Sequence, residues 1–396
     1  IMNDKNPYKT EKVNTYNKHN SFFSFSSISK DKDDVKILNR INSVYKEKKG
    51  FSILDNTHLK ILEKVIKDLN KKEVNQDSKE VFRLSRNVID ELISLSDDQI
   101  SKYLVHRYRY EIYPIIKKID DYPPYLQIEP SSICNYRCVF CFETDKSFTD
   151  KKNGFMGKMS VELFKEIIDQ IVGKVEFISL ASRGEPLANQ DINEMLNYCG
   201  GKFLNLKVNT NASLMDEKKI HSILSGGVKT IVFSADAADK KLYAKLRVNG
   251  NLNKVLKNIE NFQNIREKQY SNLKIITRVS GVKFSEEQNF DDMIKLWSGL
   301  VDQVAFVDYN PWENSYLKPV NNIENACSDL WRRMFVWWDS KVNPCDVDYK
   351  SYLSVGNIRN NTISKLWASD AYNDYRKKHL NKQRSQISPC KSCTVI

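Results

Sequence analysis

From residue 125 onwards, short apolar runs alternate with amphipathic helical stretches, and this alternation constrains the fold more than any other feature of the chain. Such alternation predicts β-α units around a parallel sheet. We expect six strands, at Tyr125 to Glu129, Val175 to Ala181, Phe203 to Asn209, Thr230 to Ser234, Lys274 to Ser280 and Val304 to Tyr309. We expect the intervening helices at 161–172, 191–199, 216–224, 252–267 and 289–297. Six units predict an α/β fold with a partial (β/α)6 TIM-like barrel, whose functional groups gather at the carboxyl ends of the strands.

The chain divides into three predicted parts. Residues 1–120 form a mostly helical accessory region, 121–315 the partial barrel, and 316–396 a small cysteine-containing domain. Helical periodicity covers 57–70 and 86–95, and a capping box at Ser96 and Gln99 predicts the start of a further helix. The first 50 residues are polar and weakly periodic, so we expect only partial order there.

Composition excludes several classes of protein. The 396 residues are 41% hydrophobic and 28% charged, which is typical of a globular chain and not of a disordered or fibrous one. No window approaches 18 uninterrupted apolar residues, and the N-terminus lacks the apolar core of a secretion signal. We therefore expect a cytoplasmic protein with no membrane partner.

The formal net charge of +12 raises the question of a nucleic-acid partner. The excess lies mainly on Lys-rich helix faces, a pattern that solvates a surface, and an anionic small substrate suits the charge equally well. The run from His106 to Tyr110 mixes basic and aromatic residues and is typical either of an amphipathic helix end or of a base-stacking surface. The non-enzyme hypothesis is an iron-sulfur or zinc protein that binds RNA through this run.

Eight cysteines carry the strongest chemical signal, because a reducing compartment disfavours structural disulfides and favours metal or redox roles for clustered thiols. Only Cys199 stands alone. The others form two groups: Cys134, Cys138 and Cys141, then Cys327, Cys345, Cys390 and Cys393.

The first group has the spacing C-x3-C-x2-C and follows the first expected barrel strand. Three thiolates on one loop can hold an iron-sulfur cube and leave one iron free to bind another molecule. A structural zinc site would need a fourth ligand at finger-like spacing, and none lies close in the sequence.

This motif, with Phe140 before its last cysteine, resembles the signature of the S-adenosylmethionine (SAM) radical enzymes. The resemblance implies that Cys134, Cys138 and Cys141 hold a [4Fe-4S] cluster whose open iron chelates the amino and carboxylate groups of SAM. One electron from the reduced cluster then splits SAM into methionine and a 5′-deoxyadenosyl radical.

The resemblance also implies SAM contacts at the ends of later strands. The segment Arg183-Gly184-Glu185-Pro186 is similar to the family's Gly-Gly-Glu-Pro, with Arg183 in place of the first Gly, and implies that Gly184 and Glu185 bind the SAM amino group. Ser234 and Arg247 match positions that hold the SAM carboxylate. The complete set of predicted cofactor contacts is Phe140, Gly184, Glu185, Asn209, Ser234, Asp236 and Arg247.

The second group of thiols resembles the twitch domain, a shortened relative of the SPASM extension, which implies one auxiliary [4Fe-4S] cluster on Cys327, Cys345, Cys390 and Cys393. With four protein ligands such a cluster has no vacancy for substrate and would accept or relay electrons. We expect Trp331, Trp337 and Trp338 to shelter it. A structural zinc ribbon is the alternative, since Cys390-x2-Cys393 is also a zinc-knuckle spacing.

Three reactions are open to a substrate radical: oxidation with the auxiliary cluster as electron acceptor, epimerisation by a thiol, and coupling. Cys199 is the only spare thiol and lies at a helix end facing away from the active face, so burial is the favoured reading and oxidation the favoured reaction. The predicted catalytic or substrate-contacting residues are Arg278, Asp308, Tyr309 and Glu313, with Asn310 and Trp312 nearby.

The favoured substrate is a small polyhydroxylated molecule such as a sugar, aminosugar or nucleotide sugar, oxidised at an alcohol carbon. The alternatives are an epimerase or coupling enzyme acting on a ribosomal peptide precursor, and a tRNA-modifying radical SAM enzyme. The expected partners are the substrate, which the basic charge allows to be anionic, and an external one-electron donor such as flavodoxin or ferredoxin.

Overall fold

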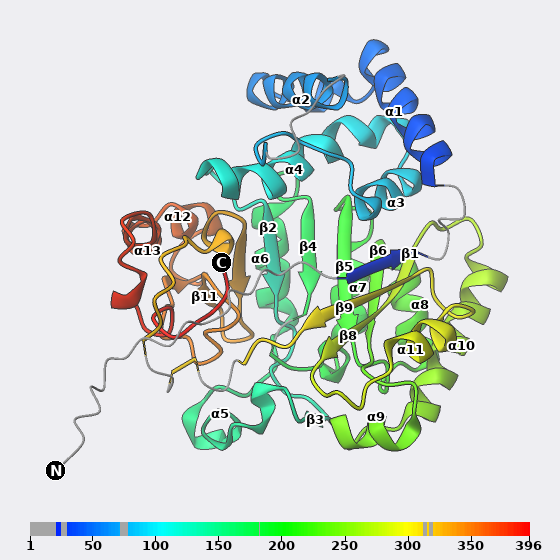
Figure 1. Ribbon diagram of the computed structural model, residues 1–396, viewed down its shortest axis with the longest axis vertical. Helices are drawn as coiled ribbons and strands as arrows, with labels where there is room; N and C mark the ends of the chain where they lie inside the picture. The colour runs from blue at the N-terminus through cyan, green and yellow to red at the C-terminus, as the bar shows by residue number, and fades with distance from the viewer. Residues whose placement is uncertain (1–20, 25–29, 72–77, 182, 312–314, 317–319) are drawn as a thin grey trace.

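The computed structural model describes residues 21–24, 30–71, 78–181, 183–311, 315–316 and 320–396, and the fold below refers to these residues. Its centre is a ten-stranded sheet in the order β1-β9-β8-β6-β5-β4-β2-β10-β11-β12. Strands β2, β4, β5, β6, β8 and β9 run parallel to one another, as an open barrel requires. Figure 1 shows helices packed against the outside of this curved sheet.

The bounds of the sheet strands are β1 Ser21–Ser24, β2 Tyr125–Ile128, β4 Phe177–Leu180, β5 Asn205–Thr210, β6 Val228–Ser234, β8 Ile276–Lys283, β9 Gln303–Asp308, β10 Arg333–Val336, β11 Lys341–Asn343 and β12 Gly356–Asn357. A separate two-stranded ribbon joins β3 (Arg137–Cys138) to β7 (Arg247–Val248). All six predicted barrel strands are thereby confirmed, with shifted ends.

The helices are α1 Lys30–Lys46, α2 Asn56–Leu69, α3 Arg86–Ser94, α4 Asp97–Ile116, α5 Lys146–Thr149, α6 Val161–Ile171, α7 Ile192–Cys199, α8 Glu217–Ser225, α9 Lys240–Leu246, α10 Leu252–Gln269, α11 Phe290–Trp297, α12 Ile363–Trp367 and α13 Asp370–Leu380. The predicted capping box at the start of α4 is present, with Ser96 N donating to Gln99 Oε1 at 3.1 Å. None of the helices in the described part of the chain is both long enough and apolar enough to cross a bilayer.

Alternate side chains on the barrel strands face two different environments. Ile178 of β4 and Val208 of β5 belong to the apolar core between the sheet and its outer helices. Because side chains alternate along a strand, Gln127, Ser179 and Lys207 face the inside of the barrel. These three residues stand at the same level on adjacent strands, so the barrel interior is polar at this level.

The N-terminal helices close the amino end of the barrel (Figure 1). They have their own apolar core, which extends to Tyr125, Phe177 and Leu204 at the beginnings of barrel strands. Polar contacts reach the same edge, for example Gln303 Nε2 donating to Asp90 Oδ2 at 2.6 Å. The helical N-terminal region therefore lies at the end of the barrel opposite the loops that follow the strands.

The run His106 to Tyr110 lies within α4 and takes part in this packing. His106 and Arg109 are buried, and Arg109 Nε donates to Asp120 Oδ2 at 2.8 Å. The amphipathic-helix interpretation is therefore correct, and these side chains do not form the predicted base-stacking surface.

Two of the strands that the sequence analysis did not predict pair with barrel strands. β1 pairs antiparallel with β9, and β10 pairs parallel with β2. The C-terminal part therefore extends the barrel sheet beyond β2, through β10, β11 and β12.

Candidate functional site

The first cysteine group lies on the loop that follows β2. Ser132 fixes this loop, because its Oγ accepts from Gly157 N at 2.7 Å and donates to Phe155 O at 2.9 Å. Cys138 then enters the two-stranded ribbon opposite Arg247. All three thiols are free of disulfides.

Nitrogen donors surround the sulfurs. Tyr136 N lies 3.4 Å and Asn211 Nδ2 3.9 Å from Cys134 Sγ, and Arg247 Nη1 lies 3.7 Å from Cys138 Sγ. Such contacts stabilise negative charge on sulfur. The site is therefore prepared for thiolates.

Cys138 is buried and Cys134 and Cys141 are half-buried. Loss of solvent raises the pKa of Cys134 to about 12 and also raises the pKa of Cys141. A buried thiolate needs a positive partner, which bound iron supplies while it displaces the proton. No three His, Cys, Asp or Glu side chains of the described chain converge as ligands of a single metal ion. In a cluster each thiolate binds its own iron, and three thiols that are close enough to raise one another's pKa fit such a group.

Gly184 and Glu185 lie directly against this loop. A Cβ on Gly184 would fall 2.5 Å from the Ser132 carbonyl carbon and 2.6 Å from Ser131 O, so only glycine fits there. Glu185 N donates to Ile133 O at 3.1 Å. The motif and the cysteine loop are thus in backbone contact.

The Glu185 carboxylate joins the loops after β4 and β5. Its Oε1 accepts from Thr210 Oγ1 at 2.7 Å and from Leu187 N at 3.0 Å, and its Oε2 accepts from Asn211 N at 2.7 Å. Burial raises the pKa of Glu185, and these hydrogen bonds oppose that rise. The carboxylate therefore positions the loops, and its contact with the SAM amino group stays a prediction.

Asp236 and Arg247 form a buried ion pair beside Cys138. Asp236 Oδ1 also accepts from Val282 N at 2.6 Å, which ties the loop after β6 to β8. Ser234 ends β6 two residues before Asp236 and is half-buried. The structure thus brings these three predicted SAM contacts to the cysteine edge of the sheet.

Asn209 and Ser179 supply unused polar atoms inside the barrel. Neither Asn209 Oδ1 nor Ser179 Oγ has a hydrogen-bond partner among the described residues, although both atoms are buried. Buried polar atoms normally find partners. These two are available to a molecule bound within the barrel.

The remaining predicted residues lie in different parts of the structure. Phe140 is buried between Arg247 and Phe284, with ring centroids 5.7 Å apart for the two phenylalanines. Tyr309 packs edge-on against Phe284 at 4.9 Å and so lies on the same side as the cysteine loop. Asp308 is exposed and lies 3.5 Å from Lys283.

Two further predicted residues, Glu313 and Trp312, lie outside the described residues. Arg278 needs a correction. It sits in the first half of β8, and its guanidinium contacts Asn87 of α3 and Gln303 at the start of β9. It therefore faces the helix-covered amino end of the barrel and not the cysteine edge, so the predicted substrate role is wrong.

Glu143, two residues after Cys141, was missed by the sequence analysis. It is 2% exposed, neither carboxylate oxygen receives a hydrogen bond from the described residues, and Arg137 Nη1 lies 3.3 Å from Oε2. Burial raises the pKa of Glu143 to about 8. Only its place directly after the motif could have indicated it.

The second cysteine group is held around Arg384. Its Nη2 donates to Cys393 O at 2.7 Å and its Nε to Cys390 O at 3.2 Å, while Asn321 Nδ2 donates to Cys393 O at 3.0 Å. Burial raises the pKa of Cys390 well above its ordinary value, and Cys393 and Cys327 are close enough to raise it further. Val347 N lies 3.3 Å from Cys345 Sγ.

The expected tryptophan shelter is only partly present. Trp331 is buried near the end of α4, under Lys117. Trp337 lies under the Arg183 guanidinium, and Trp338 Nε1 donates to Phe155 O at 3.0 Å, so these two pack against barrel residues outside the second cysteine group.

One aromatic contact joins the two cysteine groups. Phe142 follows Cys141, and its ring stacks on Tyr349, four residues after Cys345, with centroids 4.9 Å apart and planes 8° apart. Tyr349 also donates to Asp145 Oδ2 at 2.7 Å. The loop of the first group and the segment of the second are therefore in direct contact.

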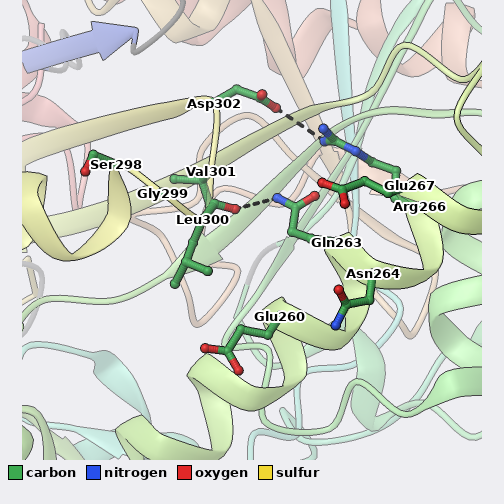
Figure 2. Close-up of a pocket in the computed structure, with 10 residues that line it drawn as sticks. All are labelled: Glu260, Gln263, Asn264, Arg266, Glu267, Ser298, Gly299, Leu300, Val301 and Asp302. Atoms are coloured by element: carbon green, nitrogen blue, oxygen red, sulfur yellow. Dashed lines mark hydrogen bonds and ion pairs between the residues drawn. The ribbon is translucent and has the colours of Figure 1, made fainter.

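Figure 2 shows a polar hollow elsewhere, between α10 and the turn before β9. Gln263 Nε2 donates to Leu300 O at 2.5 Å there, and Arg266 Nη1 lies 3.5 Å from Asp302 Oδ2. The hollow contains none of the predicted site residues. A second hollow lies beside the Glu185 loop, where residues 187–190 meet residues 213–216.

Comparison with known families agrees with this geometry. The profile of the Radical SAM superfamily matches residues 128–296, from the end of β2 to α11. These residues therefore form a radical SAM domain. The profile named SPASM, an iron-sulfur cluster-binding domain, matches residues 327–394 and identifies the C-terminal part as an auxiliary-cluster domain. Together the two domains imply SAM, a [4Fe-4S] cluster and auxiliary iron-sulfur binding.

Curated relatives are similar over part of their length. A GTP 3′,8-cyclase of Clostridium botulinum is 26% identical over 219 residues, which cover 52% of this chain and 64% of that protein. A tungsten-containing aldehyde ferredoxin oxidoreductase cofactor-modifying protein of Pyrococcus furiosus is 22% identical over 302 residues, covering 64% and 83%. The chain thus spans less than two thirds of the GTP 3′,8-cyclase.

Two solved structures superpose on this chain over most of their length. BtrN in complex with AdoMet and 2-DOIA has a TM-score of 0.45 and 16% sequence identity, and the match covers 68% of this chain and 92% of that one. Streptococcus suis SuiB bound to S-adenosylmethionine has a TM-score of 0.49 and 17% identity over 73% and 76%.

Proposed function

We propose that this protein is a radical SAM oxidoreductase that oxidises an alcohol carbon of a small polyhydroxylated substrate. SAM, cleaved with one electron from an external donor, would supply the group that removes a hydrogen atom from the substrate carbon. The substrate would then lose one electron to a cluster held by the second cysteine group and one proton to a side chain that acts as a base. The proposal assigns Cys134, Cys138 and Cys141 to the SAM-binding cluster. It assigns the auxiliary cluster to Cys327, Cys345, Cys390 and Cys393.

The observation that carries the proposal is the contact between the two cysteine groups. The Phe142 ring stacks on Tyr349, and Arg183 Nη1 donates to Tyr349 O at 2.9 Å. A four-thiol set leaves no metal position for substrate, so its use lies in electron transfer. Packing that holds this set against the SAM-binding loop supports an electron acceptor close to the reaction.

The lining of the barrel supports the substrate class. Gln127, Ser179, Lys207 and Asn209 give the interior amide, hydroxyl and ammonium groups, with unused buried atoms on Ser179 and Asn209. Such groups bind hydroxyls, and Lys207 suits an anionic substituent. A sugar, aminosugar or nucleotide sugar has this chemistry.

The chain's own residues divide the remaining tasks. Asp236 orients Arg247 toward Cys138, and Glu185 holds the loops after β4 and β5 in register. Glu143 can accept a hydrogen bond from a substrate hydroxyl at the mouth of the barrel. Tyr309 and Asp308 stay the predicted candidates for proton transfer.

A peptide substrate has less support in this structure. A leader-binding winged helix needs strands that pair with one another, whereas α1 to α4 are helices and β1 pairs with β9 of the barrel.

Cluster chemistry also requires a reducing compartment and an external one-electron donor. We place the protein in the cytoplasm, with flavodoxin or ferredoxin as that donor.

Anaerobic reconstitution tests the proposal. We expect two clusters per chain and reductant-dependent formation of 5′-deoxyadenosine. The Cys345→Ala variant should lose one cluster and substrate oxidation but still cleave SAM, whereas the matched Cys199→Ala variant should keep both clusters. Zinc in place of iron in the C-terminal group would contradict the proposed electron acceptor.

A further inference from the structure

His379 lies in the last turn of α13 and is 1% exposed. Its Nδ1 accepts a hydrogen bond from the backbone N–H of Cys327 at 3.2 Å. Its Nε2 is buried and has no partner among the described residues. The histidine is therefore anchored to one member of the second cysteine group and has one nitrogen unused.

The anchored nitrogen determines where the ring carries its proton. A backbone N–H can only donate, so Nδ1 must offer its lone pair to Cys327. Nε2 must then carry the proton, because one nitrogen's hydrogen bond sets the state of the other. His379 therefore presents a buried N–H donor, and a buried donor without an acceptor is destabilising.

The surroundings of His379 are those of an anion site. Its closest charged neighbours include Arg384, which holds the Cys390 and Cys393 carbonyls, and Lys117 at the end of α4. Lys117 is also close enough to Cys327 for a favourable electrostatic interaction. Two cations and an N–H donor around half-buried thiols match a negatively charged cluster with sulfur acceptors.

We propose that His379 donates its Nε2–H to a sulfur of the auxiliary cluster and thereby raises the reduction potential of that cluster. The inference rests on the proposed ligand assignment of the second cysteine group. A hydrogen bond to cluster sulfur stabilises the reduced state, which carries one more negative charge. His379 is thus a positioning and tuning residue that makes the cluster a better electron acceptor.

Two substitutions distinguish the roles of the two ring nitrogens of His379. His379→Asn keeps an acceptor near the position of Nδ1 for Cys327 N–H but removes the donor at Nε2. His379→Gln places an amide nitrogen near Nε2 and keeps a donor there. Both are introduced into a Cys134→Ala/Cys138→Ala/Cys141→Ala parent, so that only the C-terminal group binds iron, and the midpoint potential is followed by EPR.

We expect His379→Asn to retain the cluster and to shift its midpoint potential to a lower value, and His379→Gln to restore part of the shift. An unchanged potential with full iron content in His379→Asn would overturn the role of His379 and leave the ligand assignment intact. A triple-variant parent that binds no iron-sulfur cluster would overturn both.

A measurement on the unsubstituted histidine covers the case in which His379→Asn does not hold iron. In the wild-type protein with 15N-labelled histidine, electron-nuclear double resonance of the reduced auxiliary cluster should show coupling to a histidine nitrogen and to its exchangeable proton. Absence of both couplings would contradict the proposed hydrogen bond.

Discussion

Arg183 and Glu129 form a buried bidentate ion pair, with Nε 2.7 Å from Oε2 and Nη2 2.6 Å from Oε1. The side chains are 2% and 0% exposed. The third guanidinium nitrogen donates to Tyr349 O at 2.9 Å. The arginine that replaces the first Gly of the family motif therefore connects the end of β2, the Glu185 loop and the C-terminal domain.

Removing Arg183 should leave the Glu129 carboxylate buried without its counter-charge. We expect Arg183→Met to lower the free energy of unfolding by about 3–5 kcal/mol, the usual cost of breaking a buried pair. The Arg183→Met/Glu129→Gln double variant should recover part of this loss, as urea unfolding can measure. A loss below about 1 kcal/mol in the single variant would mean that the pair behaves like an exposed one.

Gly184→Ala tests the contact between the motif and the cysteine loop. The added methyl would meet backbone atoms of Ser131 and Ser132 at 2.5–2.6 Å, so the loop that carries Cys134 must move. We expect weaker SAM binding and reduced iron retention at the first cysteine group, measured by calorimetry and iron analysis. Gly299→Ala, where the methyl meets nothing within 4 Å, is the control and should resemble the wild type.

Tyr110 gives a pH-dependent prediction. Burial opposes ionisation, but the guanidinium groups of Arg333 and Arg332 outweigh it and lower the pKa of Tyr110 to about 7, with Arg333 Nη2 2.6 Å from the hydroxyl. The unfolded pKa is about 10. The stabilisation from ionised Tyr110 is therefore fully present above about pH 10 and is lost as the pH falls through about 7.

Comparison of wild type with Tyr110→Phe isolates this effect. The difference in free energy of unfolding should increase between about pH 7 and about pH 9, by at most about 1.4 kcal/mol per pH unit. A difference that stays constant over this interval would show that Tyr110 remains a phenol. Tyrosinate absorbance in the near ultraviolet provides an independent readout.

Tyr349 joins the two cysteine groups by two separable interactions. Tyr349→Phe keeps the stack on Phe142 and loses the hydrogen bond to Asp145, so we expect a loss of about 1 kcal/mol in unfolding free energy. Tyr349→Leu also removes the ring contacts with Phe142, Phe148 and Tyr316 and should lose about 0.5–1.5 kcal/mol more for each pair. Equal losses in the two variants, measured by urea unfolding, would argue against a stabilising role for the stack.

Local sequence signals predicted the barrel strands, their helices and the capping box of α4 because these depend on periodicity and on neighbouring residues. β1 and β10 depend instead on partners far along the chain, β9 and β2, and four-residue strands carry little pattern of their own. The sequence therefore did not indicate that the strands of the C-terminal part join the barrel sheet.

The sequence indicated the place of those site residues that belong to a motif. It did not indicate the place of residues whose position depends on where a strand begins and ends. Gly184, Asp236 and Arg247 were found through motif positions, and they lie beside the cysteine loop. Arg278 was misplaced because β8 continues to Lys283, three residues beyond the predicted end, which puts Arg278 in the first half of the strand. No motif spacing predicts Glu143, because its raised pKa comes from burial in the folded chain.

The parallel pairing of β10 with β2 limits the motion between the barrel and the C-terminal part of the chain. A shared sheet leaves no flexible linker between the barrel and β10 to β12. The distance between the two cysteine groups is therefore set by the register of β2 against β10.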